Sequence, residues 1–192
     1  MKTNFLDRMS EALPLVAQAR AFAREAHDSI DHVRKYTGLP YWNHTENVAE
    51  LMVKYNFDYQ VVIAALLHDV LEDVYPLKPY YSPNLIKELF GFKVINLVVD
   101  LTDVYTHQSY PELNRAKRKD LESDRLMSAR DDAKSVKLAD IFDNAQDIQA
   151  HDPKFAKIYK AELLSKLESL SVSNDNRNQI LWVLANMALN EK

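Results

Sequence analysis

The sequence has no cysteine among its 192 residues, and this absence excludes several kinds of site. Disulfide bonds, zinc–thiolate centres, iron–sulfur clusters and thiol nucleophiles all require that side chain. Any bound metal ion must therefore be held by His, Asp or Glu. Long apolar runs are missing too: charged residues interrupt every stretch before it reaches the ~18 residues of a membrane-spanning helix.

Glycine is scarce, with only Gly38 and Gly91 in the whole sequence. Hairpins and βα turns usually need glycine at positive φ, so this scarcity disfavours a sheet-rich fold. Apolar residues instead recur at helical spacing, as over residues 13–29 and 42–55. We therefore expect an all-α bundle that forms a single domain over residues 1–192. Further helices are predicted after Asp58, from Pro83 to a stop at Gly91, and at about 92–104, 111–129, 131–149, 154–170 and 176–190, the last packing on the rest.

The charge balance is slightly acidic, with 24 basic and 28 acidic residues and a formal net charge of −4. Nonspecific nucleic-acid binders normally carry a strong basic excess, so we expect no nucleic-acid partner. The first eight residues contain no apolar segment long enough for secretion. A cytoplasmic protein without a membrane partner is therefore expected, and the sequence leaves the oligomeric state open, a homodimer included.

Ionisable residues follow the most apolar run of the chain, Val61–Leu67. At 100° per residue of a continuous helix, His68, Asp69, Glu72 and Asp73 fall within an arc of roughly 140°. Burying three carboxylates together is prohibitive unless a cation neutralises them. Glu72 and Asp73 alone are better explained as a solvated helix end, whereas His68-Asp69 after seven apolar residues favours a metal-binding pair.

Two other residues can complete such a site. His44 lies near the start of a predicted helix, and Asp140 closes the semi-apolar stretch that begins at Val136. Taken singly, His44 is typical of a helix start and Asp140 of a salt-bridge partner. Their order and spacing relative to His68-Asp69 instead favour one ligand set of two imidazoles and two carboxylates.

This order of residues resembles the metal motif of the HD-domain phosphohydrolase superfamily, and in particular its alarmone-hydrolase branch of the RelA/SpoT type. The resemblance covers about residues 15–170. The matching blocks are Arg34-Lys35, Gly38, Pro40-Tyr41, His44 and Val48-Ala49; Ala65-Leu66-Leu67-His68-Asp69 and Glu72-Asp73; Phe90-Gly91, Val94, Leu97-Val98 and Leu101-Thr102; and Lys137-Leu138-Ala139-Asp140 with Asn144.

The resemblance implies one divalent cation, typically manganese, held by His44, His68, Asp69 and Asp140. Imidazole and carboxylate ligands are also compatible with iron, zinc or magnesium. The implied reaction removes the 3′-pyrophosphate of guanosine tetra- or pentaphosphate, giving GDP or GTP and pyrophosphate. Glu72 and Asp73 would orient or deprotonate the attacking water.

A small phosphorylated nucleotide is the partner that the resemblance implies, and a pyrophosphate group needs cations near it. Arg115 and Arg118 belong to a basic stretch that a solvated helix face would also explain, and ordinary packing would also explain Tyr159. The residues expected to contact substrate are Arg34, Lys35, Asn144, Arg115, Arg118 and Tyr159.

Several positions depart from the pattern of the family, while the metal ligands and Glu72-Asp73 keep it. This leaves two alternatives open: hydrolysis of another substrate, such as a deoxynucleotide or NADPH, and a non-catalytic nucleotide-sensing module. The intact Glu72-Asp73 pair argues against the module, which needs no water-activating groups. The departures are Tyr36-Thr37, Thr45, Val74, Ile141, Gln146 and Asp147.

Overall fold

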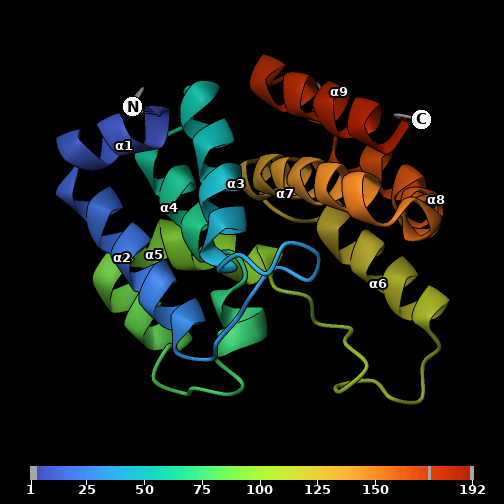
Figure 1. Ribbon diagram of the computed structural model, residues 1–192, viewed down its shortest axis with the longest axis horizontal. Coiled ribbons are helices and arrows are strands. Elements are labelled where there is room, and N and C mark those ends of the chain that lie inside the picture. The colour runs from blue at the N-terminus through green and yellow to red at the C-terminus, as the bar shows by residue number, and fades with distance from the viewer. Residues whose placement is uncertain (1–3, 173, 191–192) are drawn as a thin grey trace. The chain divides into compact units, whose positions relative to one another are not determined.

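The computed structural model describes residues 4–172 and 174–190, apart from the side chain of Ser165. In this part of the chain every regular element is a helix, and the only β-type pairing is an isolated bridge between Val33 and Pro40. Figure 1 shows these helices, coloured along the chain from blue at the N-terminus to red at the C-terminus. The all-α prediction is therefore confirmed. None of the described helices combines the length and the apolar character needed to cross a membrane.

The chain divides into two compact units, residues 1–99 and 100–192, and each is described by itself. The first contains α1 (Phe5–Ala12), α2 (Pro14–Asp28), α3 (Trp42–Lys54), α4 (Tyr59–Leu67), the π-helix η1 (Val70–Val74) and most of α5 (Pro83–Leu101). The second contains α6 (Arg115–Met127), α7 (Asp131–His151), α8 (Pro153–Leu170) and α9 (Asn176–Asn190).

The apolar run of α4 forms the core of the first unit. All seven residues of Val61–Leu67 are fully buried, and α4 packs against α2 and α3. Asp58 caps the helix by accepting a hydrogen bond from the Gln60 amide at 3.1 Å. Because such a helix is apolar on every side, it must be surrounded by other elements. This burial was predicted from the sequence.

Helix α1 was not predicted, although its start carries a capping box. The Asn4 side chain accepts from the Asp7 amide at 2.7 Å, and Asp7 accepts in return from the Asn4 amide at 3.4 Å. Glu50 of α3 adds a long-range contact by accepting from the amides of Phe5 and Leu6 at 2.8 and 2.6 Å. A carboxylate at a helix N-terminus satisfies amide groups that have no partner within the helix.

Glycine and capping residues explain two further boundaries. Gly91 breaks α5 with φ 87° and ψ 173°, consistent with the predicted stop there, and the helix resumes as far as Leu101 rather than 104. The next helix begins at Arg115 rather than 111, because the Asn114 side chain accepts from the Lys117 amide at 2.9 Å and so caps α6.

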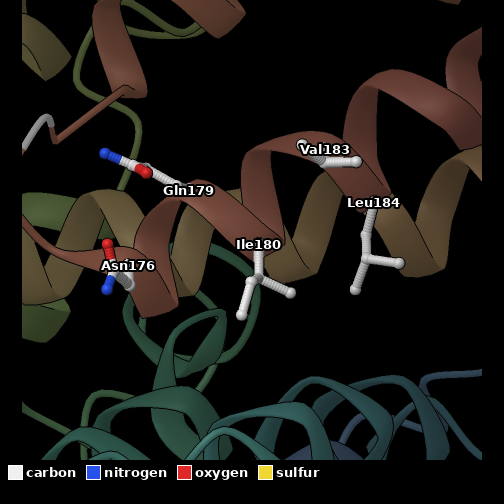
Figure 2. A pocket seen from close by; sticks show the side chains of 5 residues that line it. All are labelled: Asn176, Gln179, Ile180, Val183 and Leu184. Carbon is white, nitrogen blue, oxygen red and sulfur yellow. The ribbon is translucent and has the colours of Figure 1, made fainter.

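The second unit is organised around α7, which packs against both α8 and α9. Asn178 of α9 is fully buried, and its amide group donates to the Ser135 hydroxyl of α7 at 3.0 Å and to the Leu170 carbonyl at 3.2 Å. Another side of α9 is apolar and open: Ile180 and Leu184 point from the same side of the helix beside a hollow of about 540 Å³ (Figure 2).

Candidate metal centre

His44 and His68 bring two imidazole rings together in the first unit. His44 lies in the first turn of α3, and His68 directly follows α4; both are buried, with ring centroids 5.2 Å apart. The Nδ1 atom of His68 lies 2.8 Å from the Ala65 carbonyl oxygen. Because a carbonyl oxygen can only accept, Nδ1 carries the proton, and Nε2 of the neutral ring keeps the lone pair that a metal ligand needs.

Asp69 completes a compact set of donor atoms. Its Oδ2 atom lies 3.1 Å from His68 Nε2 and 3.8 Å from His44 Nε2. Ligands that each lie ~2.0–2.2 Å from a shared ion are separated by about 3 to 3.5 Å, so these distances are near those of a metal centre. Two imidazole nitrogens and one carboxylate oxygen are a donor set that a divalent transition metal accepts.

Tyr41 holds the Asp69 carboxylate from the loop before α3. Its hydroxyl donates to Asp69 Oδ2 at 2.7 Å. The ring of His32 stacks on the Tyr41 ring with centroids 3.7 Å apart and an interplanar angle of 8°. His27 follows, with its Nδ1 atom 3.1 Å from His32 Nδ1. Tyr41 was noted in the sequence only as part of a family block. His32 shows no partner pattern in the sequence and was expected at the surface; its contacts with Tyr41 and His27 correct that expectation.

His27 is fully buried at the end of α2, and burial lowers the pKa of its imidazole to about 4. The negative charge of Asp69 opposes this shift, while the neighbouring rings of His32, His68 and His44 add to it. The Nε2 atom of His27 has no hydrogen-bond partner among the described residues. A buried neutral ring is the state that these surroundings favour.

The segment after His68 is not a continuation of the α-helix, as the 100° spacing had assumed. The α-helix ends at Leu67, and Val70–Val74 form a π-helix in which the Tyr75 amide bonds to the Val70 carbonyl at 2.9 Å. Because a π turn is wider than an α turn, the 100° spacing does not apply to Glu72 and Asp73. Both side chains are half-buried rather than fully solvated.

Asp73 has a strongly perturbed carboxyl group. Burial raises its pKa to about 8, and the negative charges of Asp69 and Glu72 act in the same direction. The imidazoles of His68 and His44 partly oppose this increase. Its Oδ2 atom also lies 4.0 Å from His32 Nδ1. A carboxyl group whose pKa is raised by burial and by neighbouring carboxylates marks a place where a cation would be strongly stabilising.

Asp140 belongs to the second unit, on α7, and is 5% exposed. Its carboxylate oxygens contact the Lys137 ammonium at 2.8 Å and accept from the Asn144 amide at 2.6 Å. Asn144 therefore holds the Asp140 side chain one turn away, as the i, i+4 spacing predicts. Asp140 is therefore a buried side chain of the second unit that can offer a carboxylate oxygen as a ligand atom.

The remaining predicted substrate contacts lie in two places. Arg34 and Lys35 lie in the loop that leads to Tyr41; the Lys35 ammonium lies 4.7 Å from the Tyr36 ring centroid. In the second unit, Arg115 pairs with Glu162 at 2.6 Å, and the Arg118 guanidinium donates to the Leu113 carbonyl. Tyr159 is half-buried on α8, with its ring 6.3 Å from that of Phe155.

Comparison with known proteins identifies the family. The family model described as "HD domain" matches residues 19–167. The pyrophosphohydrolase MESH1 of Xenopus tropicalis, which acts on guanosine-3′,5′-bis(diphosphate), is 32% identical over 151 residues, covering 76% of each chain. The corresponding Aquifex aeolicus enzyme is 31% identical over 169 residues, or 83% of this chain.

The lengths of these relatives differ. The chain spans 20% and 22% of the Mycoplasma pneumoniae and Aquifex aeolicus relatives, and 59% of Drosophila melanogaster MESH1. A solved structure described as a metazoan ortholog of SpoT that hydrolyses ppGpp matches with a TM-score of 0.71 and 28% identity, covering 89% of this chain and 93% of the other. The chain therefore belongs to the HD-domain family and is similar to MESH1-type and SpoT-type ppGpp 3′-pyrophosphohydrolases.

Proposed function

We propose that this protein is a metal-dependent hydrolase that removes the 3′-pyrophosphate from guanosine tetra- or pentaphosphate. The observation that carries the proposal is the convergence of His44 Nε2, His68 Nε2 and Asp69 Oδ2 in a buried site. Relatives that cover most of this chain and carry that activity in their names support the choice of substrate.

One divalent ion, with manganese the first choice, is proposed to be held by His44, His68, Asp69 and Asp140. Such an ion supplies Lewis-acid chemistry, because it acidifies water and stabilises negative charge on phosphoryl oxygens. The donor set fits it: the protonated Nδ1 of His68 leaves Nε2 available, and the carboxylates provide compensating charge.

In the proposed reaction, the oxygen of a water molecule bonds to the phosphorus attached to the ribose 3′-oxygen. The bond between that phosphorus and the 3′-oxygen breaks, and the products are GDP or GTP and pyrophosphate. Glu72 is proposed to accept the proton of the water, while Asp73 orients the water by a hydrogen bond. The leaving 3′-oxygen takes up a proton from Glu72 by way of solvent and ends as a hydroxyl group, which returns Glu72 to its carboxylate form.

The proposed substrate contacts are the cationic side chains of Arg34 and Lys35 in the loop before α3, together with Asn144, Arg115, Arg118 and Tyr159 of the second unit. Cations stabilise the pyrophosphate through charge-assisted hydrogen bonds. The single domain over residues 1–192, the cytoplasmic location and the oligomeric state stay predictions.

A substrate panel tests the proposal. Purified protein with manganese is incubated separately with guanosine tetraphosphate, deoxynucleoside triphosphates and NADPH, and the products are identified by ³¹P NMR and chromatography. We expect GDP and pyrophosphate from the tetraphosphate. Phosphate or triphosphate released only from the other compounds would indicate a different phosphohydrolase. Tight nucleotide binding without turnover in any metal would indicate a sensing module.

Glu72→Gln tests the role of the proposed base. General-base assistance contributes ~10²–10⁴-fold to a rate, so we expect kcat to fall by that order. The bound metal should be retained, because Glu72 is not a proposed ligand. Glu88→Gln, at an exposed position of α5, is the matched control and should keep the wild-type rate. Full activity of Glu72→Gln would refute this role.

A further inference from the structure

A cavity lined by charged side chains lies between α6 and α8 of the second unit, with a volume of about 370 Å³. Three cationic side chains line it: Arg115 and Lys119 from α6, and Lys166 from α8. The carboxyl groups of Asp120 and Glu162 line it as well. The proposed metal ligands and the Glu72-Asp73 pair take no part in this cavity.

Lys166 is the unusual member of this set because it is a buried lysine. Lys166 is only 6% exposed. Its side chain forms no ion pair or hydrogen bond with the described residues. Burial lowers its pKa to about 8, and the positive charges of Lys119 and Lys137 act in the same direction. Asp103 and Glu122 exert the opposite effect from a distance.

Such a lysine is energetically costly. Taking an ammonium group out of water carries a penalty of several kcal/mol unless an opposite charge and hydrogen bonds compensate for it. Long side chains at protein surfaces normally avoid this by extending to solvent. A buried ammonium on the wall of a cavity is therefore a group that an anion in the cavity would stabilise.

The two other cations are already fixed by carboxylates. Arg115 donates to both oxygens of Glu162, at 2.6 and 2.8 Å, and Lys119 lies 3.6 Å from Asp103. These pairs neutralise Glu162 and hold both cations along the cavity wall. Asp120 is exposed. Among the described residues of the cavity wall, Lys166 is thus the cation without an ion-pair partner.

We propose that the cavity between α6 and α8 binds a small phosphate-bearing anion, with the Lys166 ammonium as its principal contact. Arg115 and Lys119 supply additional donors at the same wall. Arg115 and Lys119 are already paired with carboxylates, so the main attraction comes from the Lys166 ammonium, and lysine is a common point-charge ligand of phosphate. The volume leaves room for a diphosphate group rather than a halide-sized ion.

The site shares Arg115 with the proposed substrate contacts but uses none of the proposed metal ligands, so it can bind an anion whether or not the proposed reaction takes place. Its test is therefore a binding measurement on chelator-treated protein, in which no metal ion can bridge the anion. Inorganic pyrophosphate is the probe, titrated by calorimetry into wild type, Lys166→Met and Lys157→Met. Lys157 is exposed on the same helix, so its substitution removes an equal charge outside the cavity.

We expect Lys166→Met to bind pyrophosphate at least 10-fold more weakly than wild type, and Lys157→Met to stay within 2-fold. Equal affinities of Lys166→Met and wild type, or no binding to wild type, would overturn the proposal. GDP serves as a second probe: GDP affinity that falls in Lys166→Met shows that the cavity accepts a nucleoside diphosphate, and an effect of Lys166→Met on pyrophosphate alone shows that it takes the free anion.

Thermal unfolding provides an independent readout for the same variants. Methionine nearly matches lysine in length and carries no charge to desolvate, so Lys166→Met should fold and have a Tm equal to or above that of the wild type without pyrophosphate. Pyrophosphate should raise the Tm of the wild type and of Lys157→Met, since a ligand that binds the native state stabilises it. An equal rise in Lys166→Met would contradict the assignment.

Discussion

Asp69 receives contacts from three side chains at the candidate metal centre. His44 and His68 approach its Oδ2 atom with their Nε2 atoms, and Tyr41 donates its hydroxyl proton to the same atom. A hydrogen bond to a ligating carboxylate fixes its orientation, and loss of such a partner typically weakens metal binding ~10–100-fold. Tyr41 is thus expected to strengthen metal binding without being a ligand itself.

Tyr41→Phe removes only the hydroxyl group that contacts Asp69. We expect the Kd for manganese to rise at least ~10-fold, measured by calorimetry, while the Tm of the metal-free protein stays near the wild-type value. Tyr80→Phe is the control, because Tyr80 is 68% exposed and its ring contacts that of Tyr81. An unchanged manganese Kd in Tyr41→Phe would show that this hydrogen bond does not support the metal site.

The lowered pKa of His27 predicts how the stability of the protein depends on pH. Its pKa is about 4 in the folded protein against 6.5 for the free side chain, so the unfolded chain binds more protons between these values. The contribution of His27 to stability is therefore complete above pH 6.5 and is lost as the pH falls towards 4, by up to about 1.4 kcal/mol per pH unit. The raised pKa of Asp73 has the opposite sign, since its contribution weakens as the pH rises from 3.8 to about 8.

The test compares the wild type with His27→Gln. Because Asp73 is present in both, its effect cancels in the difference between their free energies of unfolding at each pH. Denaturant unfolding of chelator-treated protein from pH 4 to 7 should show that the variant loses less stability on acidification than the wild type. His107→Gln, on an exposed loop, should follow the wild type. Identical pH slopes for His27→Gln and wild type would contradict a neutral buried ring.

At the scale of the element, the π-helix Val70–Val74 is the feature that the sequence did not indicate. No residue type marks a π turn in the way that proline or glycine marks a helix boundary, and Glu72 and Asp73 are equally compatible with a regular helix. A capping box at Asn4 and Asp7 was, by contrast, a detectable signal for α1. Its stabilisation by Glu50 of α3 is a long-range contact that local spacing cannot reveal.

The kink in α5 gives an element-scale prediction. Gly91 has φ 87° and ψ 173°, a region that is open essentially to glycine alone, although an added Cβ would meet no atom within 4 Å. The cost of Gly91→Ala is therefore backbone strain rather than a clash, and we expect the free energy of unfolding to fall by about 1–3 kcal/mol. Chemical denaturation measures it, with Glu88→Ala on the same helix as the control. A loss below ~0.5 kcal/mol would mean that the backbone relaxes at this position.

At the scale of the whole molecule, composition and periodicity were sufficient for the fold class. The scarcity of glycine and the buried run Val61–Leu67 predicted an all-α chain with α4 at the core of its unit, and both are observed. The order of His44, His68-Asp69 and Asp140 led to the family, which the match over residues 19–167 confirms. Local patterns could not predict the Tyr41–Asp69 contact, because the two residues are 28 positions apart.

The substrate is the part that neither pattern nor fold determines. Positions such as Tyr36-Thr37 and Asp147 differ from the family pattern while the ligand residues keep it. The metal centre is therefore the claim on which the function depends, since every HD-type reaction considered for this chain needs it. It can be tested without choosing a substrate.

The most direct test is manganese binding to chelator-treated protein, followed by calorimetry and elemental analysis. We expect the wild type to bind one manganese ion per chain. His68→Ala and Asp69→Ala should retain no ion after dialysis, and Asp140→Ala should bind the ion clearly more weakly than the wild type. His107→Ala should bind like the wild type. Wild-type protein that takes up no divalent ion, or His68→Ala that binds it as tightly as the wild type, would contradict the proposed metal centre.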